Sequence, residues 1–339
     1  MIQSAAKTPS LTTPASTTPS LNRDLFRQAS VLIGCVSLFA IFSVLTGSFY
    51  QPSNLIDIML QSSINAVIAV GMTLVIITRG IDLSVGSIVG LSSMVVSDLM
   101  SHNIALDIFA DLVVGVICAL INGVLIAKLK LPDFVVTLGT LRIFRGAALI
   151  YTNGQPIYGL PEGFRTAFGG QLLGVPTPVI MAIVVAGLGF FLVRFTALGE
   201  QIVAVGGNEE AARLSGINID RVKIVVYTLS GLLSSLAGFV LIARIGAAEP
   251  IGGNGFELQA IGAAVIGGAS LFGGVGNPLG SLIGALTLGG LQNGLTLMNV
   301  PSFCQYVASG VVVILAVYAD RLARPVDDGV APNITSRLI

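Results

Sequence analysis

Charged residues are scarce in this sequence. Asp, Glu, Lys and Arg make up 10% of its 339 residues, whereas hydrophobic residues make up 54%. Because an ordinary soluble domain carries about 25% charged residues, this composition excludes that class and indicates a chain that lies mostly in lipid. Lys and Arg number 17 and Asp and Glu also number 17, so no excess of positive charge favours nucleic acid as a partner.

The residue types that carry most metal and nucleotide chemistry are also few. There is one histidine, and the three cysteines (Cys35, Cys118 and Cys304) lie in apolar stretches without the spacing of metal ligands or a disulfide framework. A phosphate-binding loop requires Gly-Lys followed by Ser or Thr, but the four lysines follow Ala, Ala, Leu and Val. We therefore expect no metal, no cofactor and no catalytic residue, and the chain is predicted not to be an enzyme.

What the sequence has instead is a series of ten long apolar runs. A helix needs about 20 mostly apolar residues to cross a bilayer, and breaks containing Gly, Pro or charged residues separate these runs. The predicted fold class is all-α, a polytopic membrane protein with about ten transmembrane helices over residues 28–320. Residues 1–27, rich in Ser, Thr and Pro, are predicted to form a disordered N-terminal tail, and residues 321–339 a C-terminal tail. The runs lie at 28–48, 57–78, 83–101, 105–127, 133–151, 176–197, 223–243, 255–272, 278–298 and 303–320.

The placement of Lys and Arg predicts the orientation of the helices. With an even number of spans both termini lie on one side, and thirteen of the 17 basic residues fall in the termini and loops of that side. Two fall in loops of the opposite side, and Arg142 and Arg145 fall within a span. Because basic residues gather in cytoplasmic loops, we expect both termini to be cytoplasmic.

The longest charged break in the second half, residues 198–222, contains the signals of a short helix on the cytoplasmic side. Asn208 is a good N-cap, and Glu209 and Glu210 complement the positive end of a helix. Arg213 lies toward the negative end, and Gly216 can adopt the left-handed conformation that ends a helix. These signals predict about two helical turns over residues 209–215.

This short helix requires support from other residues or another protein. Isolated helices below about 12 residues are marginal in water, so we expect another surface to pack against Ala211 and Leu214. That surface is either a partner protein or the ends of the helices of this chain, and the residues alone favour neither alternative.

Polar residues at membrane depth are candidates for lining a solute pathway or for pinning helices together, because unpaired polar groups in lipid are costly. Asp82 is expected to cap the helix that starts near Ser84, and this role is favoured over a substrate contact. Asn122 and Asn293, each followed by glycine, are expected to hydrogen-bond across closely packed helices. The amides of Gln292 and Asn293 are also candidates to face a hydroxylated solute. The candidate pathway or helix-pinning residues are Asn65, Asp82, Ser84, Asn122, Gln292 and Asn293.

Three further polar residues, Arg142, Arg145 and Gln259, also fall within predicted spans. The two arginines are three positions apart and therefore share a helix face. They are expected to pair with a carboxylate, to meet water in a cavity or to lie near the membrane interface.

Five segments of the sequence stand out together: GMTLVIITRGIDLSVGSIVGL at 71–91, NGVLIAKLKLPDFVVTLGTLRIFRG at 122–146, VGGNEEAARLSGI at 205–217, TLSGLLSSLAG at 228–238 and AIGAAVIGGASLFGGVG at 260–276. In this order they resemble the permeases of sugar ABC importers of the ribose, arabinose and allose type. The resemblance covers nearly the whole ordered length of the chain. One departure is Arg79, where many members of that family carry a small residue.

This resemblance implies an importer permease bundle in the bacterial inner membrane, surrounded by membrane lipid, that translocates a monosaccharide. It implies a second permease copy, identical or paralogous, a periplasmic sugar-binding protein, and cytoplasmic ABC ATPase subunits that use the ATP. The family's coupling helix matches residues 207–217, which favours a partner protein over the chain's own helices as the surface that covers the short helix. The residues implied to couple to the ATPase are Asn208, Glu209, Glu210, Ala211, Arg213, Leu214 and Gly216.

The residues by themselves leave a second class of function open. An ion-gradient-driven secondary transporter or channel for a small polar solute would also be a bundle of spanning helices, and Asp82 would give it a protonatable site.

Overall fold

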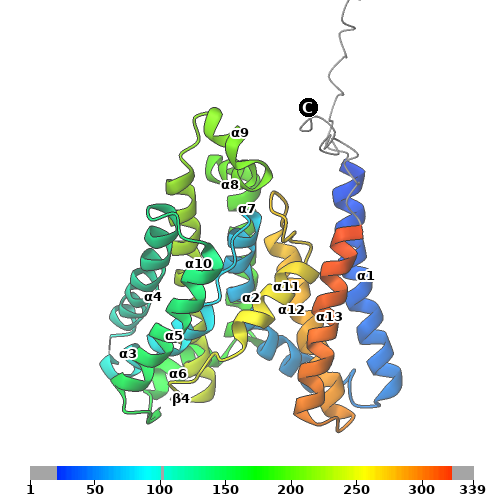
Figure 1. Cartoon of the computed structure of the whole chain (residues 1–339). Helices are drawn as coiled ribbons and strands as arrows, with labels where there is room; N and C mark the ends of the chain where they lie inside the picture. Colours follow the sequence, from blue (N-terminus) through cyan, green and yellow to red (C-terminus); the bar gives the residue numbers. More distant parts are fainter. Residues whose placement is uncertain (1–20, 101–102, 323–339) are drawn as a thin grey trace, which may run out of the picture.

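The computed structural model describes residues 21–100 and 103–322, and most of these residues are helical. The long helices run side by side between two ends of the molecule (Figure 1). We call these the α9 end, where α8 and α9 lie, and the α6 end, where α6 and β4 lie. The helices are α1 (Leu21–Leu45), α2 (Pro52–Ile77), α3 (Val85–Leu99), α4 (Ile104–Ala127), α5 (Asp133–Tyr151), α6 (Glu162–Gly169), α7 (Thr177–Phe195), α8 (Ala197–Gly207), α9 (Glu209–Leu214), α10 (Ile219–Ile245), α11 (Phe256–Ile266), α12 (Pro278–Leu297) and α13 (Ser302–Leu322).

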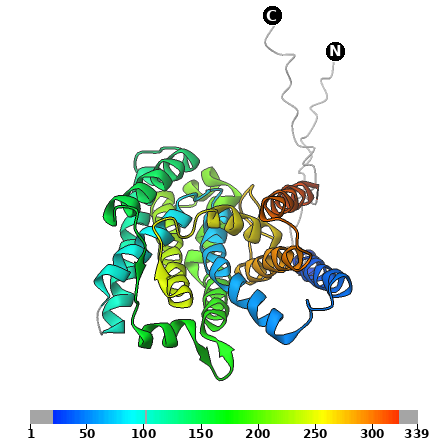
Figure 2. The same ribbon diagram turned by 90° about the horizontal axis from the view of Figure 1, so that it is seen from below.

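Helix α2 forms the centre of the bundle. It packs against α7, α10, α11 and α12, and 83% of the residues in its most apolar stretch of 18 residues are buried. A helix that is apolar on all sides can be covered on all sides, which explains its central position. Helices α1, α12 and α13 lie together at one side, where Phe42 and Phe49 pack against Ile58 and Leu291 (Figure 2).

Glycine allows the closest helix crossings. A Cβ at Gly284 of α12 would overlap the carbonyl oxygen of Ala263 in α11, and a Cβ at Gly231 of α10 would overlap the side chain of Ala119 in α4. These helices therefore approach backbone to backbone, as small residues permit in membranes. This arrangement agrees with the many glycines of the sequence.

The predicted all-α polytopic class agrees with the structure, and each of the ten predicted ranges contains a helix. Six of the described helices (α2, α4, α5, α7, α10 and α13) are long and apolar enough to cross a membrane. Shorter apolar helical stretches are Val31–Leu45 within α1, helix α3 (Val85–Leu99) and helix α11 (Phe256–Ile266). The number of spans therefore stays a prediction.

Two short antiparallel strand pairs interrupt the helical pattern. In the first, β1 (Ile157–Tyr158) pairs with β4 (Ala247–Ala248), and Ile157 lies opposite Ala248. In the second, β2 (Gln171–Leu172) pairs with β3 (Val175–Pro176), and Leu172 lies opposite Val175. The first pair joins the segment after α5 to the segment after α10 at the α6 end.

Some predicted boundaries were wrong. Helix α1 begins at Leu21, inside the predicted disordered tail 1–27, because Leu, Arg and Gln at the start of this segment favour a helix. Helix α11 ends at Ile266 and not at residue 272, since Gly267 and the left-handed Gly268 (φ 96°) stop it. Helix α13 extends to Leu322, two residues into the predicted C-terminal tail. The rest of both predicted tails, residues 1–20 and 323–339, lies outside the described residues.

Candidate functional site

The short helix at the α9 end begins and ends close to the predicted positions. The side-chain oxygen of Asn208 accepts a hydrogen bond from the backbone amide of Ala211 at 3.0 Å, which satisfies one of the free amides of the first turn. The helix then runs from Glu209 to Leu214, one residue short of the predicted range. Gly216 follows with a left-handed φ of 83°. Local capping therefore fixes where α9 starts and stops.

One side of α9 rests on the bundle and the other is uncovered. Ala212 is 4% exposed and belongs to an apolar cluster that includes Val205 and Val222. Leu214, in contrast, is 82% exposed, and Ala211 is also exposed. The helix is thus anchored through Ala212, while its two other apolar side chains face away from the described part of the chain.

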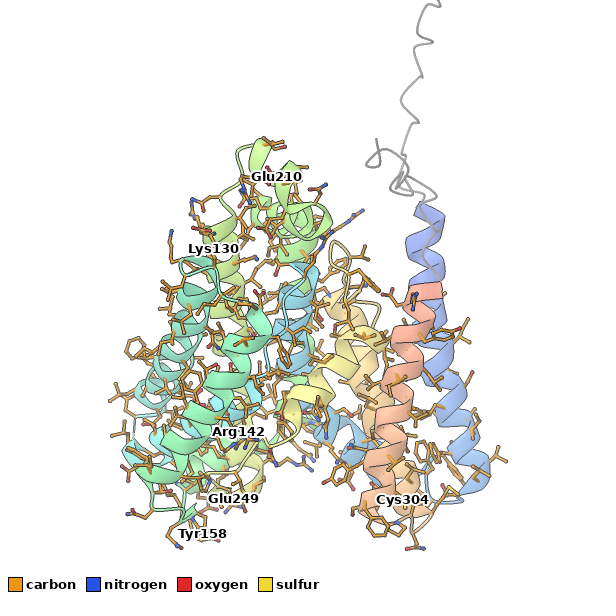
Figure 3. All side chains as sticks on the ribbon, viewed as in Figure 1. Lys130, Arg142, Tyr158, Glu210, Glu249 and Cys304 are labelled. Carbon is orange, nitrogen blue, oxygen red and sulfur yellow. The ribbon has the colours of Figure 1, made fainter. Side chains whose placement is uncertain are left out.

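Ion pairs orient α9 against the start of α10. Lys223 of α10 lies 3.4 Å from a carboxylate oxygen of Glu209. Within α9, Arg213 lies 3.8 Å from Glu209 and 3.6 Å from Glu210, which is at the tip of the molecule in Figure 3. Exposed pairs such as these contribute about 1 kcal/mol or less each. They therefore add little to the stability of α9, and their main effect is on its orientation.

The sequence-based prediction missed helix α8, which leads into α9. Its N-cap is Thr196, whose hydroxyl accepts from the amide of Gly199 at 3.1 Å. The Gly-Gly pair at its end and Glu200 made this segment resemble a loop. Its apolar residues Ile202 and Val205 are buried, and their spacing of three was the signal for a helix.

Asp82 lies in a buried hydrogen-bond network between helices. One of its carboxylate oxygens accepts from the amide of Ser84 at 3.0 Å and from the hydroxyl of Ser84 at 2.6 Å. The other accepts from the hydroxyl of Ser230 in α10 at 3.0 Å, and the Asn122 amide of α4 donates to the Ser84 hydroxyl at 2.7 Å. Asp82, Ser84 and Asn122 are fully buried. Ser84 is the N-cap of α3, and no side chain caps the first turn, so Asp82 does not cap the helix as expected. Its carboxylate instead joins the start of α3 to α10.

Two amide pairs bring α2 against its neighbours. The Asn65 amide of α2 donates to the side-chain oxygen of Gln259 in α11 at 2.5 Å. Asn293 of α12 and Asn54 of α2 exchange two hydrogen bonds of 2.9 and 3.0 Å. The Asn293 side-chain amide therefore joins α12 to α2. Gln292, the neighbouring candidate, is half-buried.

The two arginines of α5 have different surroundings although they share a helix face in the sequence. Arg145 donates to the carbonyl oxygens of Pro250 at 3.1 Å and Gly252 at 2.9 Å. Arg142 is exposed and lies between the two ends of the molecule (Figure 3). Arg145 therefore holds the loop before α11, whereas Arg142 is available to water or to another chain.

Two buried carboxyl groups of α4 were also missed by the sequence-based prediction. Asp107 and Asp111 are 3% and 1% exposed and lie one turn apart. Their place in the most apolar helix of the chain was the signal that such residues are buried against neighbouring helices. In the part of the chain that the structure describes, no group of three or more His, Cys, Asp or Glu could hold a metal.

The best-defined cavity, about 480 Å³, lies between α1, α11, α12 and α13. Its lining is mostly apolar, with Val31, Val265 and Ala316 among its members, and its hydrogen-bonding side chains are Thr287 and Asp320. Two such side chains are fewer polar groups than a site that holds a sugar tightly would bring together.

Comparison with known proteins gives one consistent family. Residues 54–317 match the family described as the permease component of the branched-chain amino acid transport system. The chain is 45% identical over 304 residues to the ribose import permease protein RbsC of Escherichia coli K12, covering 88% of this chain and 94% of that protein. It is 39% identical over 289 residues to the D-allose transport system permease protein AlsC of the same strain, covering 84% and 89%.

A third relative carries the transporter class in its name. The chain is 38% identical over 305 residues to the L-arabinose ABC transporter permease protein AraH of Azospirillum brasilense, covering 88% of this chain and 89% of that protein. No solved structure matches the chain. The family match and these relatives show that the chain belongs to the permease family of sugar ABC importers.

Proposed function

We propose that this chain is the permease subunit of an ABC importer that translocates a ribose-like monosaccharide across the bacterial inner membrane. A periplasmic binding protein delivers the sugar, and separate cytoplasmic ATPase subunits use the ATP. The chain itself holds no cofactor and catalyses no reaction. The observation that carries this proposal is the uncovered apolar side of α9, with Leu214 82% exposed at one end of a helix bundle.

Charge supports placing the α9 end in the cytoplasm. Most of the described basic residues lie at the ends of helices and in loops at this end, whereas Arg165 and Arg244 lie at the α6 end and Arg142 and Arg145 lie within α5. By the positive-inside rule, this asymmetry supports a cytoplasmic position for the start of α1 and the end of α13. It also supports ten membrane-embedded helices, namely α1 to α5, α7 and α10 to α13. The basic residues at the α9 end are Arg79, Lys128, Lys130, Arg194, Arg213, Arg221, Lys223 and Arg321.

The exposed side of α5 supports a second permease copy beside this one. Phe134, Leu138 and Ile143 are exposed on this helix together with Arg142. Arg142 lies near the middle of α5, where a cation facing lipid costs about 2.5 to 3.5 kcal/mol. A second copy that encloses a water-filled pathway against this side would remove that cost. In this arrangement Arg142 lines the pathway, and the Asp82 network holds the helices behind it.

The choice of a ribose-like sugar comes from the relatives, whose names specify ribose, allose and arabinose. A permease fed by a binding protein has no need to hold its sugar tightly, since the binding protein supplies the selectivity. This agrees with a described cavity whose lining is mostly apolar and includes only two hydrogen-bonding side chains, Thr287 and Asp320.

Reconstitution in liposomes tests the proposed function. Uptake of radiolabelled ribose is expected only when the permease, its ATPase, its binding protein and ATP are all present, because the sequence has no nucleotide motif. Liposomes without the permease are the control. If the permease alone accumulated ribose with a proton or sodium gradient, the chain would be a secondary transporter and the importer proposal would fail.

A further inference from the structure

The chain leaves helix α2 through Arg79, which has an unusual backbone conformation for an arginine. After the last helical residue, Ile77, the chain passes through Thr78 to Arg79, which has a left-handed φ of 65°. Residues with a Cβ adopt this region at a steric cost, whereas glycine does not. Arg79 is therefore held at a position where glycine would be the unstrained choice.

The Arg79 side chain binds the end of α8. Its Nε donates to the carbonyl oxygen of Gly206 at 2.7 Å, and its Nη2 donates to the carbonyl oxygen of Gly207 at 2.6 Å. These are the last carbonyls of α8, which have no partner within the helix and carry the negative end of its dipole. The planar fork of a guanidinium can bind two neighbouring carbonyls at once, which a lysine ammonium does less rigidly.

A third segment joins this contact. The amide of Gly274, in the turn between α11 and α12, donates to the carbonyl oxygen of Ile77 at 2.8 Å. A Cβ at Gly206 would overlap that same carbonyl, and a Cβ at Gly273 would overlap the Arg79 side chain. We call this meeting of α2, α8 and the Gly273–Gly274 turn the Arg79 junction. Its three backbones are in direct contact, so none can shift alone.

From this geometry we infer that Arg79 is a positioning residue that passes movement of α9 into the centre of the bundle. The inference rests on the proposed function, in which an ATPase moves α9. Asn208, the N-cap of α9, directly follows the Gly207 carbonyl that Arg79 binds. A displacement of α9 therefore pulls on the end of α2, which packs against α7, α10, α11 and α12. Without Arg79, exposed ion pairs and the chain connections to α7 and α10 carry the movement.

The substitution Arg79→Gly tests this role, because it removes the guanidinium and relieves the strained φ. We expect folded yield, thermal stability and ATPase co-purification to match those of the unmodified complex. Ribose transported per ATP hydrolysed is expected to fall about fivefold or more, the usual size of a coupling between sites. Arg79→Lys keeps the positive charge but lacks the planar guanidinium, so its ratio of ribose to ATP should lie between those of Arg79→Gly and the unmodified complex. Arg194→Ala, which changes another exposed arginine at the α9 end, is the matched control and should leave the ratio unchanged.

A second measurement does not depend on transport. The backbone amide of Asn208 donates a hydrogen bond to the carbonyl oxygen of Ala204 at 3.1 Å, in the last turn of α8. Its hydrogen exchange is expected to be about tenfold faster in Arg79→Gly than in Arg194→Ala, because the end of α8 opens more often without the clamp. Unchanged exchange overturns the junction even if the complex imports ribose. Faster exchange with an unchanged ratio of ribose to ATP overturns the transmitting role. If even the unmodified complex shows no ATP-driven uptake, the proposed function fails, and exchange still decides whether the clamp exists.

Discussion

Replacing Leu214 with Asp is expected to abolish ribose uptake and to reduce the ATPase that co-purifies with the permease roughly thirtyfold. Leu214 is the apolar side chain that α9 presents most fully, and Ala211 extends the same uncovered side. We expect a partner that covers this side to offer an apolar socket, in which a buried carboxylate would lack a counter-charge. The bundle itself should fold normally, because surface substitutions change the free energy of unfolding by about 0.5 kcal/mol or less. Co-purification and uptake measure the two effects separately.

The matched control is Leu173→Asp. Leu173 is 97% exposed, but it lies in the turn between β2 and β3, which follows α6 at the opposite end of the molecule. Its φ of 53° suits Asp, which tolerates the left-handed region better than most residues. This variant should bind the ATPase normally. Normal ATPase binding and uptake by Leu214→Asp would remove α9 from the coupling site.

The second large effect is expected at Asp82. Asp82→Ala leaves the Ser230 hydroxyl and the Ser84 amide without their acceptor in a fully buried site. Unpaired buried donors of this kind cost about 2 to 4 kcal/mol in total. The midpoint of thermal unfolding of the purified permease should therefore fall by at least about 5 °C.

Asp98→Ala is the control for Asp82, because Asp98 is an exposed carboxylate whose described partner is the Tyr151 hydroxyl at 2.7 Å. Its removal should change the unfolding midpoint little. An Asp82→Ala permease with normal thermal stability and a weaker apparent affinity for ribose would show that Asp82 contacts substrate, contrary to its place in the helix-pinning network.

Local patterns predicted much of this structure. Apolar runs of spanning length gave a helix in each predicted range, since burial in lipid requires both length and apolarity. Capping signals are equally local: α9 starts after Asn208 and ends before Gly216, as the chemistry of these two residues indicates. The contact between Asp82 and the Ser84 amide is local too, but the predicted capping role was wrong, because Ser84 is the N-cap of α3.

Contacts between residues far apart in the sequence could not be predicted from such local patterns. The Asn54–Asn293 amide pair joins positions 239 residues apart, and the Arg79–Gly206 contact spans 127 positions. Neither spacing leaves a periodic signal in the sequence. The packing of α2 against its neighbours decides which of these polar groups meet.

Cysteine labelling from the two sides of the membrane tests the central claim most directly. That claim is that α9 lies in the cytoplasm, where ATPases can bind it. Exposed Cys304 lies at the end opposite Glu210 (Figure 3), so a membrane-impermeant maleimide should label Cys304 in intact cells whose outer membrane is permeable to it. Glu210→Cys, in a chain with Cys35 and Cys304 replaced by serine, should be labelled only after the inner membrane is opened. Labelling of Glu210→Cys in intact cells would place α9 outside and contradict the orientation, the coupling site and the importer mechanism together.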